Sequence, residues 1–100
     1  GTNERMKSLY ALGRVQERRK KPKEAKNAYE RLRALSPKDD GARLSALLRL
    51  GLMLELEDKP GSAAPLYAEV LKHAQRGGQT FETARKRLES LSSDKSLIRR

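Results

Sequence analysis

The chain has 100 residues, a net charge of +10 and an apolar fraction of 36%, which suits repeats that pack on their neighbours better than one large core. It has no cysteine, so disulfides and thiolate metal sites are excluded, and no apolar run approaches the roughly 20 residues that span a bilayer. Residues 1–50 hold 14 basic and 6 acidic side chains, and such a surface attracts acidic proteins, nucleic acid or anionic lipid. We expect a soluble chain of the cytoplasm or periplasm, and the composition does not choose between them.

Two helices are expected in the first 35 residues. Apolar side chains recur every three or four positions over residues 3–20, which is helical spacing, and again over residues 22–35. Pro22 is well placed to open the second helix, because its missing N–H would have no partner in a first turn. Ser36–Asp40 is expected to be a loop, with Asp40 as the N-cap of a third helix.

The third helix, over residues 41–57, is apolar around most of its circumference. Leucine or methionine occupies eight of its positions, so we expect neighbours on several sides to enclose it. The alternative is that Leu48 and Leu52 line an exposed apolar groove that receives a helix of a partner.

The fourth helix has to accommodate two prolines. If it began at Pro60, Pro65 would lie inside it and remove a backbone hydrogen bond, so Ser62 is the expected N-cap. This helix is expected to continue to about residue 75 and to end before a pair of glycines. A fifth helix is expected over residues 80–91, followed by a polar, basic tail over residues 92–100.

The chain also repeats itself at an offset of 38 residues. A glycine, a proline, an alanine, a tyrosine and two leucines recur at this offset: Gly13 and Gly51, Pro22 and Pro60, Ala25 and Ala63, Tyr29 and Tyr67, Leu9 and Leu47, Leu12 and Leu50. A fixed period of this size is typical of helical repeat arrays, whose stacked units build a surface that holds another molecule.

The repeated residues resemble the tetratricopeptide repeat, a helix–turn–helix of about 34 residues with the pattern W-x2-L-G-x2-Y, then A-x3-F, then P. The chain matches this pattern twice. The first unit has Leu9-x2-Leu12-Gly13-x2-Gln16, then Ala25-x3-Tyr29, then Pro37. The second unit has Leu47-x2-Leu50-Gly51-x2-Leu54, then Ala63-x3-Tyr67, with Gln75 in place of the proline. Leucine replaces the tryptophan in both units, and the first unit has a longer connection to the second than the pattern requires. Such connections are similar to those of tetratricopeptide-like proteins of bacterial envelope assembly.

The resemblance implies an all-α fold, a right-handed α-solenoid of antiparallel helix pairs. One helical repeat domain would cover residues 1–91, with a first repeat over about 5–38, a second over about 43–76 and the extra helix over about 80–91. The small glycine and alanine would let the paired helices approach, and the tyrosine would fill the gap between units.

The resemblance further implies a non-catalytic protein-interaction scaffold, here a fragment of a larger bacterial protein, with no cofactor. Its partner would be a peptide or helix of another protein, acidic partners included, and self-association through the open ends of the stack is a further expectation. The partner would lie in a concave groove lined by the first helix of each pair, and the expected groove residues are Tyr10, Arg14, Glu17, Leu48, Leu52 and Glu55.

A dense basic run follows the first helix, comprising Arg18, Arg19, Lys20, Lys21 and Lys23. Its simplest interpretation is a solvated turn, because no aromatic side chain is interleaved with it for stacking on bases. The alternative function is a basic nucleic-acid-binding helical module, in which this run contacts phosphates. His73 is the only histidine, so no zinc site is expected, and no set of residues suggests catalysis.

Overall fold

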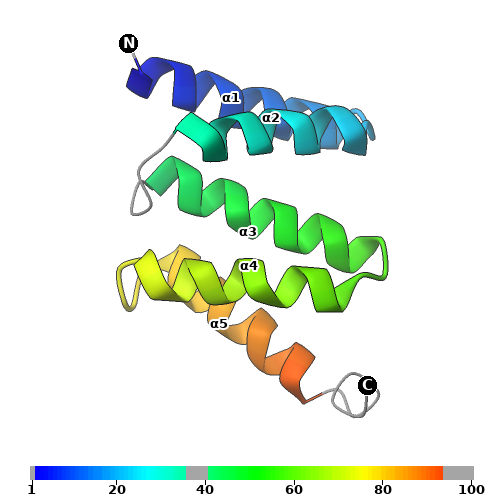
Figure 1. Ribbon diagram of the computed structural model, residues 1–100, viewed down its shortest axis with the longest axis vertical. Helices are drawn as coiled ribbons and strands as arrows, with labels where there is room; N and C mark the ends of the chain where they lie inside the picture. Colours follow the sequence, from blue (N-terminus) through cyan, green and yellow to red (C-terminus); the bar gives the residue numbers. More distant parts are fainter. Residues whose placement is uncertain (1, 36–40, 94–100) are drawn as a thin grey trace. The chain divides into compact units, whose positions relative to one another are not determined.

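The computed structural model describes residues 2–35 and 41–93, and these residues form helices without any strand. The helices are α1 (Thr2–Arg18), α2 (Pro22–Leu35), α3 (Gly41–Leu56), α4 (Pro60–His73) and α5 (Gln79–Ser92) (Figure 1). All five agree with the expected helices to within a turn, which confirms the all-α class. The predicted loop and cap at Ser36–Asp40 and most of the predicted tail lie outside the described residues. None of the described helices is both long and apolar enough to span a bilayer.

The chain forms two compact units, residues 1–46 and residues 47–100. In the first unit, α1 and α2 lie side by side and run in opposite directions (Figure 1). The fully buried Tyr29 ring of α2 lies directly against the backbone of α1 at Gly13, where an added Cβ would be 2.6 Å from the ring Cζ. Glycine is therefore required at this position by the close approach of the ring.

The second unit repeats this contact between α3 and α4. Tyr67 is also fully buried, and an added Cβ at Gly51 would be 2.8 Å from its ring Cζ. α5 also packs against α4, and Ala63, Val70 and Ala84 are fully buried within this unit. The 38-residue offset in the sequence thus corresponds to a repeated glycine–tyrosine contact in space.

The turns that close α1 and α3 also share one backbone geometry. Lys20 and Asp58, which are 38 residues apart, adopt positive φ angles of 59° and 60°. Each turn has the two hydrogen bonds of a Schellman motif. After α1, Lys21 N–H donates to the Gln16 carbonyl and Lys20 N–H to the Glu17 carbonyl. After α3, Lys59 N–H donates to the Leu54 carbonyl and Asp58 N–H to the Glu55 carbonyl. Neither left-handed position is occupied by the glycine that usually takes it.

The start of α4 differs from the prediction. The helix begins at Pro60 with Lys59 as its N-cap, so the expected N-cap at Ser62 is wrong and Pro65 lies inside the helix. The physical reason is the preceding turn, which leaves the Lys59 carbonyl in position to accept the N–H groups of Ser62 and Ala63. Pro65 is exposed, so the carbonyl that loses its helical partner can bond to water instead.

Candidate partner-binding surfaces

The expected groove residues of the first unit lie on one side of α1. Tyr10 is half-buried, with its ring centroid 5.9 Å from that of Tyr29. Arg14 is also half-buried, and its Nη1 lies 3.6 Å from Glu17 Oε2. Glu17 accepts a hydrogen bond from the Tyr29 hydroxyl, and its side chain is only 13% exposed. Tyr10 and Arg14 therefore have free surface for a ligand, whereas Glu17 is largely used inside the unit.

Two of the expected groove residues of α3 are leucines that keep exposed surface. Leu48 and Leu52 are four residues apart, hence on one side of the helix, and both keep part of their surface exposed. Leu44, Leu47, Leu50 and Met53 are buried, but Leu56 is 88% exposed. The expectation that neighbours would enclose all the leucines of this helix is therefore wrong, and Leu56 at its end is open to solvent.

Glu55 holds the second unit together. Its carboxylate accepts hydrogen bonds from the Tyr67 hydroxyl of α4 and from the Arg87 guanidinium of α5, with Arg87 Nε 3.0 Å from Glu55 Oε2. The hydrogen bond from Arg87 lowers the pKa of Glu55, although burial acts in the opposite direction. Burial and the adjacent carboxylate raise the pKa of the Tyr67 hydroxyl. A charged carboxylate at this point thus joins three helices, a role that the sequence analysis did not foresee for Arg87.

The basic run spans the end of α1, the turn after it and the first residues of α2. Its five side chains are all exposed: Arg18, Arg19, Lys20, Lys21 and Lys23. In the part of the chain that the structure describes, none of them forms an ion pair. The prediction of a solvent-facing turn is in keeping with this exposure, and the cations are free to meet an external anion.

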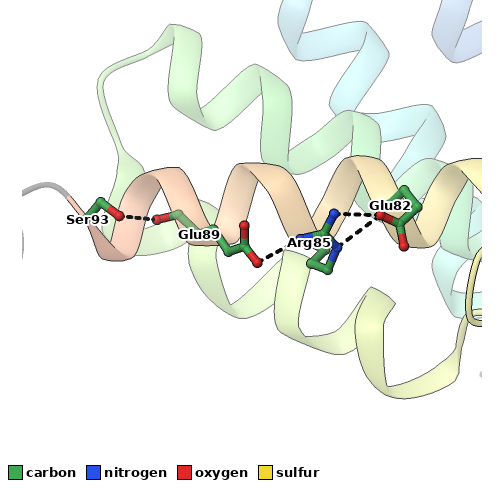
Figure 2. A network of polar contacts seen from close by, with 4 residues as sticks. All are labelled: Glu82, Arg85, Glu89 and Ser93. Carbon is green, nitrogen blue, oxygen red and sulfur yellow. Dashed lines mark hydrogen bonds and ion pairs between the residues drawn. The ribbon is translucent and has the colours of Figure 1, made fainter.

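A further polar network lies on α5, where the sequence analysis predicted a helix but no such network. Arg85 bonds Glu82 at 2.7 Å and Glu89 at 2.8 Å, and the Ser93 hydroxyl donates to the Glu89 carbonyl (Figure 2). The spacings of three and four residues place these charges on adjacent turns, and the hydrogen bonds that Arg85 donates to both carboxylates raise the pKa of its guanidinium. An open pocket of about 520 Å³ lies beside this network, lined by Leu71, Arg85, Leu88, Glu89, Ser92 and Ser93.

Residues 6–39 match the family model of the tetratricopeptide repeat. The matched segment contains most of α1, the basic turn and α2, and hence the contact of Gly13 with Tyr29. The match supports assignment of the chain to the tetratricopeptide repeat family, and the described helices fit a helical repeat solenoid. Repeats of this family generally mediate protein–protein interaction and are typically non-catalytic. Searches of curated proteins and of solved structures found no match to the chain.

Proposed function

We propose that this chain is a protein-interaction scaffold, with repeats over residues 5–38 and 43–76, that binds a peptide or helical segment of a partner protein. The first helix of each pair would supply the binding surface. On α1, Tyr10 offers a ring and Arg14 a cation. On α3, Leu48 and Leu52 offer apolar contact. No reactive group takes part, so the function is recognition rather than chemistry.

The observation that carries the proposal is the repeat match together with the exposed surface of these side chains. Leu48 and Leu52 keep exposed area on a helix whose neighbouring leucines, such as Leu47 and Leu50, are buried. An apolar pair at a spacing of four residues suits the contact stripe of an amphipathic helix or an extended peptide. Glu17 and Glu55 support this surface from within, because hydrogen bonds from Tyr29 and Tyr67 fix their carboxylates.

The test uses peptides selected from a displayed random library against the full chain. The double variant Leu48→Asp with Leu52→Asp should weaken the selected peptides by more than tenfold, because it places two charges in the apolar contact. Leu56→Asp is the matched control: it makes the same change on the same helix at a leucine that is already 88% exposed, and it should leave affinity unchanged. Circular dichroism has to show equal helix content in all three proteins. Equal affinity of the double variant and the control would refute the proposed surface.

A further inference from the structure

The turn between α1 and α2 has the same backbone conformation as the turn between α3 and α4, but the opposite net charge. Residues 17–24 carry five cations and two carboxylates, a net charge of +3, whereas the equivalent residues 55–62 carry one cation and three carboxylates, a net charge of −2. Both segments form the Schellman turn with a left-handed residue at its centre, Lys20 in one and Asp58 in the other. The fold therefore does not require the cations of the first turn.

Two of these cations are placed where the backbone disfavours them. Lys20 occupies a left-handed conformation that glycine, asparagine or aspartate adopts more readily. Lys23 lies in the first turn of α2, where the helix dipole disfavours positive charge. Within the described residues, neither side chain is paired with a carboxylate. The free-energy cost of placing a cation at these positions is therefore not offset by an ion pair.

The basic turn continues the α1 surface of the proposed groove. Tyr10, Arg14 and Arg18 follow each other at steps of four residues, so they lie on successive turns of one side of α1. This side leads from the proposed peptide contact to the exposed cations. A ligand that follows α1 toward its C-terminal end would meet first Arg14, then Arg18 and the turn. Within residues 17–24 the cations are opposed by two carboxylates, Glu24 and Glu17, and the Glu17 carboxylate also accepts the Tyr29 hydroxyl and pairs with Arg14.

We infer that the partner segment is acidic at one end, and that a run of its Asp or Glu carboxylates docks on the exposed cations of the α1–α2 turn. This inference rests on the proposed function, because it identifies the chemistry of the peptide that the α1 surface binds. A peptide suits the site better than a nucleic acid, because the turn has no aromatic side chain on which bases could stack and follows directly on the α1 surface of the proposed groove. The cations would speed association and fix the direction in which the peptide lies.

The test compares two variants with the same change in net charge. Arg19→Glu with Lys20→Asp gives the first turn the residues Glu57 and Asp58 of the second, which already form this backbone. Lys72→Glu with Lys86→Asp is the control and changes two exposed cations of α4 and α5. Peptides selected from the random library against the unaltered chain should be enriched in Asp and Glu at one end. The turn variant should bind them about tenfold more weakly at low salt, the control should bind them normally, and the difference should shrink as salt is added.

Every other outcome contradicts this inference, and one of them also contradicts the proposed function. Selected peptides that need Leu48 and Leu52 but show no acidic enrichment, or that bind the turn variant as tightly as the control, would overturn the inference and leave the proposed function in place. Failure to select any peptide that depends on those leucines would overturn both. If a single-stranded oligonucleotide bound more tightly than the peptides and lost its affinity in the turn variant, the basic turn would be a nucleic-acid site and the inference would be wrong.

Discussion

Replacing Gly51 with alanine should destabilise the second unit, although alanine is the better helix former. Alanine gains about 1 kcal/mol over glycine in a helix interior. Against this, the new methyl group would lie 2.8 Å from Cζ of Tyr67, whereas carbon atoms prefer about 3.5–4.0 Å. Tyr67 is fully buried and its hydroxyl is bound to Glu55, so the rigid ring has no free direction in which to retreat.

The net cost can be worked out from these contacts. Overpacking of a core costs about 1–3 kcal/mol. Displacing the ring also weakens a hydrogen bond to a carboxylate, and such bonds contribute about 1.5–3 kcal/mol. After subtraction of the gain in helix propensity, we expect Gly51→Ala to lower the free energy of unfolding by about 2 kcal/mol. For a chain of this size that corresponds to a fall in Tm of about 10 °C.

Thermal and urea unfolding followed by circular dichroism would measure this change. Gly61→Ala is the matched control, because it lies in α4 with nothing within 4 Å of the added Cβ. The control should be neutral or stabilised by up to about 1 kcal/mol. If Gly51→Ala stabilised the chain as much as Gly61→Ala does, the close contact of the tyrosine ring with the backbone of α3 would be refuted.

Three further outcomes are expected. Because the folded-state pKa of Glu55 is lowered, its charge stabilises the fold above the unfolded-state pKa, near 4.5, and this contribution is lost as the pH falls below that value. In acid titrations, Glu55→Gln should therefore lose less stability than the unaltered chain. Equal losses would contradict the reasoning. Tyr67→Phe should lower the free energy of unfolding by about 1.5–3 kcal/mol in urea titrations, and an unchanged midpoint would show that its hydroxyl adds nothing. Lys20→Gly should stabilise the chain by about 0.5 kcal/mol, and more than Asp58→Gly does, because aspartate tolerates the left-handed conformation better; the reverse order would refute the strain at Lys20.

The helices could be predicted from the sequence because local signals agree with the tertiary fold. Apolar spacing gave each helix, and the 38-residue offset identified Gly13 and Tyr29 as structural partners of the same kind as Gly51 and Tyr67. These residues act through size, and size is readable from the sequence. The start of α4 was not predictable in this way, because the competing signals of Pro60 and Pro65 are decided by the hydrogen bonds of the preceding turn.

The candidate site was harder to predict than the fold. Tyr10, Arg14, Leu48 and Leu52 have the exposure that a ligand would need, but a helical pattern alone could not reveal that Glu17 and Glu55 point inward to tyrosine hydroxyls. Such a contact joins residues 12 positions apart on different helices. The pairing of Arg87 with Glu55 spans 32 positions and follows from no local periodicity.

Comparison of the two repeats separates the residues that make the fold from those that are free to serve a partner. The glycines and tyrosines that match at the 38-residue offset are buried and form the same contact in both units. Positions that differ most, such as Lys20 against Asp58, lie in turns with one backbone geometry. Because the same backbone forms with either charge, the fold does not require a cation there. On our inference, an acidic segment of a partner accounts for the positive charge of the first turn. Reversing that charge with residues that already form this backbone in the second turn therefore tests recognition without disturbing the repeat.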